Sequence, residues 1–196
     1  MIHKVSEKII NWQIIKGNLR ECEQNKYIYA YEILLNQLIN LTIAIVLAFI
    51  SQELKAVLIF LAIYIPLRKY AGGFHAKNNG RCIIYSTFII IVVILLNKRL
   101  RYFPNGNIAE ICFLLLLVFV WYVAPIEAKN KKLAMEERRK FRKKVHLVCV
   151  MHIFIMTLNV FVLKRTCISI NILLGYLTLF GVLIITYKDK KMKIAN

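Results

Sequence analysis

Six long apolar segments constrain the fold of this chain more than any other feature of the sequence. They lie at residues 28–50, 54–67, 82–96, 109–126, 146–163 and 168–187. With 59% hydrophobic residues in a chain of 196, the apolar content exceeds what a soluble domain of this size can bury. The segments also lack the strict alternation of membrane β-barrel strands. The sequence therefore predicts an all-α integral membrane protein, with residues 1–196 forming a single membrane domain.

Two of the six segments are short for a membrane crossing. As helices, residues 54–67 and 82–96 would measure about 21 to 23 Å, against a hydrocarbon core of about 30 Å. We expect about six transmembrane helices, with these two either borrowing length from flanking residues or re-entering the membrane. Residues 1–26 are charged throughout, so we expect no cleaved signal peptide. This stretch instead predicts an amphipathic helix in the membrane interface, with Ile2, Val5, Ile9 and Trp12 at helical spacing.

The distribution of positive charge predicts the topology. Most of the 28 lysines and arginines lie in residues 1–27, 68–81, 128–145 and 188–196. By the positive-inside rule, both termini and the loops 68–81 and 128–145 face the cytoplasmic side of a cell membrane. A net charge of +18 favours anionic lipid or an acidic peptide as a partner.

The five cysteines do not form a disulfide framework in this prediction. Their number is odd, and the topology places Cys22 and Cys82 in the reducing cytoplasm. Cys112 and Cys149 lie inside apolar segments, where a cysteine is usually a packing residue. The series His146, Cys149 and His152 resembles metal-ligand spacing, but positions six apart diverge by roughly 120° around a helix. We expect neither a metal nor a cofactor.

One polar stretch, YAGGFHAKNNGRC at residues 70–82, carries the reactive groups. Cys82 opens an apolar helix, where free backbone amides and nearby basic residues such as Lys77 favour a thiolate. Glycines around His75 permit close approach of the imidazole to the thiol. A Cys–His pair is the minimum for nucleophilic acyl transfer. On spacing alone, a lipid-headgroup site or a structural loop is the alternative.

A polar stripe also lies on the first long apolar segment. Glu32, Asn36 and Asn40 recur at spacings of four residues and therefore share one helix face. We expect this face either to line a cavity beside the 68–81 loop or to bind a neighbouring helix.

Several of these features together resemble one known family. The order of Arg68, AGGFHA, the gap from His75 to Cys82 and Ser86 one turn later is similar to that of the accessory gene regulator protein B (AgrB) family, membrane cysteine peptidases of Gram-positive bacteria. The segments APIEAKNKK from Ala124 and YEILLNQLIN from Tyr31 also resemble that family. The likeness covers most of the chain and weakens beyond about residue 145.

The resemblance implies a function in quorum sensing. It carries the family's catalytic pair onto His75 and Cys82, and its motif arginine and glycine onto Arg68 and Gly73. Arg68 would stabilise an oxyanion or hold a substrate carboxylate. The implied reaction is cleavage of a peptide precursor through a thioester on Cys82, followed by closure of a thiolactone or lactone ring. The implied partner is a short peptide with an amphipathic start and an acidic tail.

Other classes of function remain open at this stage. A transporter or channel subunit for an anionic or peptide substrate is the main alternative, although the segments show no internal repeat. A membrane scaffold, in which Cys82 is incidental, is another. A homodimer is compatible with the sequence, and no nucleic acid partner is expected.

Overall fold

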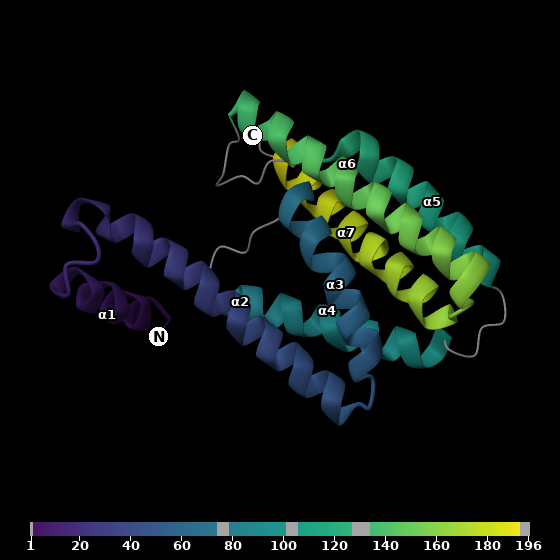
Figure 1. Cartoon of the computed structure of the whole chain (residues 1–196), viewed down its shortest axis with the longest axis horizontal. Coiled ribbons are helices and arrows are strands. Elements are labelled where there is room, and N and C mark those ends of the chain that lie inside the picture. The colour runs from purple at the N-terminus through teal and green to yellow at the C-terminus, as the bar shows by residue number, and fades with distance from the viewer. Residues whose placement is uncertain (1, 74–78, 101–105, 127–133, 193–196) are drawn as a thin grey trace.

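The chain folds into helices, as the apolar segments predict (Figure 1). A computed structural model describes residues 2–73, 79–100, 106–126 and 134–192. Within these residues there is no strand, only one isolated parallel bridge between Gly72 and Ile126. The α-helices are α1 (Ile2–Ile15), α2 (Gln24–Ile50), α3 (Leu54–Ala71), α4 (Asn79–Leu100), α5 (Gly106–Val123), α6 (Met135–Leu158) and α7 (Thr166–Met192). A 3-10 turn, Glu21–Glu23, precedes α2, and a π-helical turn, Asn159–Leu163, ends α6.

Each predicted apolar segment corresponds to a helix, but several predicted bounds were too narrow. α3 continues to Ala71 and α4 runs from Asn79 to Leu100, so the predicted 68–81 loop is shorter than expected. At 22 residues, α4 is about 33 Å long and can cross the membrane. α6 begins at Met135, so much of the predicted 128–145 loop is helical. A hydropathy window misses such ends because lysine and arginine extend a helix while keeping their charges in water.

Four helical stretches are long and apolar enough to cross a membrane in the described part of the chain. They cover Glu21–Ile50, Gly80–Leu100, Met135–Leu163 and Thr166–Tyr187, and a shorter apolar helix covers Ile108–Val123. Large apolar side chains are exposed on the outer faces of the bundle, including Phe49, Phe88 and Leu115. An apolar exterior of this kind suits a lipid surround, so the chain is an all-α membrane protein.

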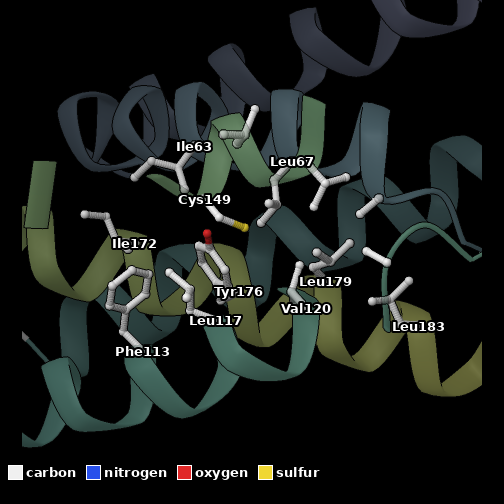
Figure 2. Close-up of a cluster of buried hydrophobic side chains, with 14 of the residues drawn as sticks. Ile63, Leu67, Phe113, Leu117, Val120, Cys149, Ile172, Tyr176, Leu179 and Leu183 are labelled. Carbon is white, nitrogen blue, oxygen red and sulfur yellow. The ribbon is translucent and has the colours of Figure 1, made fainter. Parts of the chain in front are cut away.

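Two apolar clusters hold the bundle together. The first joins α3, α5, α6 and α7 around Tyr176, whose side chain is fully buried and meets Phe113 edge to face (Figure 2). The second joins α2, α3, α4 and α7 around Phe60 and includes the small residues Ala44 and Ala48 of α2. Because α3 and α7 contribute to both clusters, they form the centre of the fold (Figure 1).

The N-terminal helix packs along the start of α2 (Figure 1). Ser6 and Ile10 of α1 are fully buried, and Gln24 donates a hydrogen bond to Asn11 over 2.7 Å. The predicted amphipathic helix therefore exists, but it ends at Ile15 and a turn separates it from α2.

Candidate functional site

Cys82 lies in the first turn of α4, as a free, half-buried thiol. It therefore lies beside backbone amides that have no partner within the helix. The Asn40 side chain of α2 donates its Nδ2–H to Cys82 Sγ over 3.8 Å. The structure thus brings together a thiol and an amide that lie 42 residues apart in the sequence.

The three residues of the predicted polar stripe on α2 have different neighbours. Glu32 pairs with Nδ1 of His3 from α1, away from Cys82. Asn36 is 8% exposed, and in the described part of the chain its Oδ1 atom has no hydrogen-bond partner. Asn40 meets Cys82. Only the last member of the stripe therefore contacts the thiol, while the first joins two helices at the N-terminal end.

The end of α3 is held in a fixed shape by Arg68 and two glycines. The Arg68 guanidinium donates to the carbonyl oxygen of Gly72. Gly72 and Gly73 have φ angles of 75° and 105°, a region that favours glycine. A Cβ atom on Gly73 would lie 2.9 Å from Arg68 Nη1. The two glycines of the AGGFHA segment thus leave no room for side chains.

The same segment pairs with the chain that follows α5. Gly73 N donates to Ile126 O over 3.1 Å, and Ile126 N donates to Ala71 O over 3.0 Å. A Cβ atom on Gly72 would lie 2.2 Å from Ile126 O, so glycine is required for this approach. The APIEAKNKK segment therefore starts beside the AGGFHA segment, and we call this backbone pairing the 72–126 clamp.

Tyr64 is a polar neighbour of Arg68 that the sequence analysis did not identify. Its hydroxyl shares a hydrogen bond with Arg68. Tyr64 precedes Arg68 by four residues on α3, so the two share a helix face. This spacing could have identified Tyr64 from the sequence. An aromatic residue in an apolar segment, however, more often has a packing role.

Not all predicted site residues can be placed. His75 and Lys77 lie outside the described residues. Ser86 lies one turn after Cys82 on α4 and is half-buried.

A basic surface adjoins the end of α3. The first turns of α6 carry exposed cationic residues, namely Arg138, Arg139, Lys140, Arg142, Lys143 and Lys144. Phe141 packs against Tyr70 with ring centroids 6.2 Å apart, and Lys144 Nζ lies 5.2 Å from the Tyr70 ring centroid. We call these six cationic residues the α6 basic surface. Through the contacts with Tyr70, this surface adjoins α3, the helix that carries Arg68.

His146, Cys149 and His152 have separate partners. His146 stacks on Trp121 at 3.9 Å between ring centroids and pairs with the Trp121 carbonyl oxygen. His152 Nδ1 pairs with the Tyr176 hydroxyl, and Cys149 lies in the first apolar cluster beside Tyr176 (Figure 2). Each side chain thus has a packing or hydrogen-bonding role, and among the described residues no group of three His, Cys, Asp or Glu side chains is arranged to hold a metal ion.

A second polar cluster lies at the other end of α4. Asn97 and Asn171 exchange hydrogen bonds of 3.1 and 2.9 Å, and each also bonds a carbonyl oxygen of its own helix. These buried amides join α4 to α7. They are far along α4 from Cys82.

Comparisons with known proteins identify the family of the chain. The model of the family Accessory gene regulator B matches residues 2–186. AgrB-like protein 2 of Clostridium perfringens strain 13 is 27% identical over 169 residues, covering 82% of this chain and 78% of that protein. An AgrB-like protein of C. perfringens strain SM101 is 28% identical over 163 residues, covering 80% and 74%.

A third relative, an AgrB-like protein of Clostridium acetobutylicum, is 27% identical over 158 residues, covering 80% of this chain and 73% of its own. No solved structure matches the chain. Since the family model spans nearly all of the sequence and the membrane helices agree with it, this chain belongs to the accessory gene regulator B family, which takes part in processing quorum-sensing peptide precursors.

Proposed function

We propose that this protein is a membrane cysteine endopeptidase that cleaves an autoinducing-peptide precursor and closes the released fragment into a ring. The observation that carries the proposal is the position of Cys82 at the start of a membrane helix, in contact with a polar side chain of α2. In the sequence, His75 follows Gly73, a residue of the 72–126 clamp, by two positions. Family membership supports the substrate class.

The proposed mechanism uses His75 and Cys82 as a dyad. His75 removes the thiol proton, and the thiolate attacks the carbonyl carbon of a precursor peptide bond, forming a C–S bond. The C–N bond then breaks, and the imidazolium gives its proton to the amine of the departing C-terminal fragment. The thioester left on Cys82 passes to a cysteine or serine of the same peptide, which closes a thiolactone or lactone and frees the thiol.

The membrane setting favours ring closure over hydrolysis. Exchange between thioesters is nearly balanced, whereas hydrolysis of a thioester is strongly downhill, so a site with little water protects the cyclic product. Cys82 is half-buried on a helix that can span the membrane, which is consistent with restricted access of water. We further propose that the site faces the cytoplasm of a Gram-positive cell and that the α6 basic surface receives the acidic tail of the precursor.

The test is processing by purified protein in liposomes, with the precursor taken from a short reading frame beside the gene. We expect Cys82→Ala and His75→Ala each to abolish cleavage, because each removes one half of the dyad. Cys112→Ala is the matched control, since Cys112 lies in α5 outside the site, and it should retain cleavage. Cleavage by the Cys82→Ala protein would exclude the proposed nucleophile.

A further inference from the structure

The Asn40 side chain is placed as a hydrogen-bond donor at the reacting thiol. Its Nδ2 atom lies 3.8 Å from Cys82 Sγ, and it comes from α2, a helix that packs along α4. One and two turns further along α2, Ala44 and Ala48 pack in the second cluster, which also contains Ile90 and Val93 of α4. The small side chains allow α2 and α4 to approach closely, so the Asn40 amide is held in place by the helix contact itself.

Asn40 directs its amide N–H at a thiol of another helix, whereas Asn97, Asn171 and Asn159 direct theirs at amide, carbonyl or hydroxyl oxygens. Asn97 and Asn171 bond each other and their own helices, which is a structural use. Asn159 bonds the main chain of Arg165 and the hydroxyl of Ser169. In the described part of the chain, the buried Oδ1 atom of Asn40 has no partner. That atom is an acceptor, and Asn36 Oδ1 is in the same state, so the contact of the N–H with Cys82 is what distinguishes Asn40.

The reaction proposed above supplies a use for this donor. When the Cys82 thiolate adds to a carbonyl carbon, the electron pair of the C=O bond moves to oxygen, and the oxygen becomes negatively charged. That oxygen is attached to the carbon that has just bonded to Sγ, so a donor that contacts the sulfur also lies near the oxyanion. Donors fixed in advance at this position stabilise the transition state.

We propose that the Asn40 amide is an oxyanion-hole donor for the acyl transfer at Cys82. In the free enzyme its N–H contacts the sulfur, and in the tetrahedral intermediate it donates to the oxyanion. When the intermediate collapses, the C–N bond breaks, the C=O bond re-forms and the hydrogen bond to oxygen weakens. This inference rests on the proposed function, to which it adds a catalytic residue outside the AGGFHA segment.

The test compares Asn40→Leu and Asn40→Gln with the wild-type chain in liposomes. Leucine is close to asparagine in size but has no donor, whereas glutamine keeps the amide. We expect Asn40→Leu to lower kcat by about 100- to 1,000-fold and to change KM by less than about threefold, as for the loss of one oxyanion donor. The kcat of Asn40→Gln should be at least about tenfold higher than that of Asn40→Leu, because glutamine restores the donor at a shifted position.

A second readout separates this role from a purely structural one. In a chain whose other cysteines are replaced by alanine, iodoacetamide alkylates Cys82 without forming an oxyanion. We therefore expect Asn40→Leu to slow alkylation by less than about tenfold, far less than it slows processing. Alkylation and processing that fall together would show that Asn40 only positions Cys82, and would overturn the proposal.

The control is Asn97→Leu, which makes the same change in a buried asparagine at the far end of α4. It should reduce thermal stability but leave kcat close to that of the wild type. An Asn40→Leu protein with wild-type kcat would overturn this inference alone, provided that Cys82→Ala is inactive in the same assay. A wild-type chain that leaves the precursor whole would instead overturn the proposed function, and this inference with it.

Discussion

At the scale of single residues, Gly73 is a position where one added carbon should disturb Arg68 directly. Its φ angle is 105°, and a Cβ atom would lie 2.9 Å from Arg68 Nη1 and 3.1 Å from Val182 Cγ1. Strain in this region of φ costs about 1 to 3 kcal/mol. We therefore expect Gly73→Ala to displace Arg68 and the chain that leads to His75, and to lower the processing rate at least tenfold in a liposome assay, roughly the effect of 1.4 kcal/mol.

Gly80→Ala is the matched control, because a Cβ atom on Gly80 meets no other atom within 4 Å and the residue lies in α4. Its processing rate should remain within about twofold of the wild type, since alanine favours the helix. If the two variants lose processing activity equally, the clash at Gly73 is not the cause of the loss. That result would contradict the prediction.

At the scale of elements, the contact between α2 and α4 determines where the thiol and the amide meet. Ala44 and Ala48 are 2% and 0% exposed in this contact, and Ala44 lies one turn after Asn40. We expect Ala44→Leu to destabilise the fold by about 1 to 3 kcal/mol through overpacking. Because the helices must separate to admit the larger side chain, processing should fall as well. Thermal unfolding in detergent and the processing rate measure the two effects.

Val46→Leu provides the comparison for that experiment, since Val46 lies on the same helix with an exposed side chain and should face lipid. We expect it to change neither stability nor processing measurably. If Ala44→Leu unfolds at the wild-type temperature and processes normally, then α2 and α4 do not need the close contact that the structure describes.

The sequence was informative about elements and less so about their contacts. Continuous hydrophobicity predicted all six long helices, because a lipid surround requires apolar side chains along most of each span. It missed the helical ends at Ala71, Asn79 and Met135, where polar residues continue the helix beyond the apolar run. The periodicity of the polar stripe was visible, but which neighbour each residue meets depends on packing of distant segments. Thus Glu32 reaches His3 and Asn40 reaches Cys82.

At the scale of the whole molecule, charge asymmetry should guide the substrate. The α6 basic surface adjoins α3 through Tyr70, on the side of the bundle where the 72–126 clamp lies. Exposed ion pairs contribute about 0.2 to 1 kcal/mol each. We expect joint replacement of Arg138, Arg139 and Lys143 by glutamine to raise KM for the precursor by roughly threefold to a hundredfold, with a smaller effect on kcat.

The control for this prediction is the joint replacement of Lys98, Arg99 and Lys164 by glutamine at the other end of the bundle, which removes the same charge. Its KM should stay near the wild-type value. Raising the salt concentration should also raise the wild-type KM, since the Debye length is about 10 Å at 0.1 M. A KM that responds to neither the charges nor the salt would mean that apolar contacts in the bilayer carry recognition.

The 72–126 clamp has a consequence for how far such sequences can diverge. Its hydrogen bonds join main-chain atoms of Ala71, Gly73 and Ile126, so the bonds do not depend on which side chain occupies position 126. Proline is excluded at 73 and 126, because both residues donate an N–H, and glycine is required at 72 and 73. A joint built from backbone groups allows most of the surrounding side chains to change without loss of its hydrogen bonds.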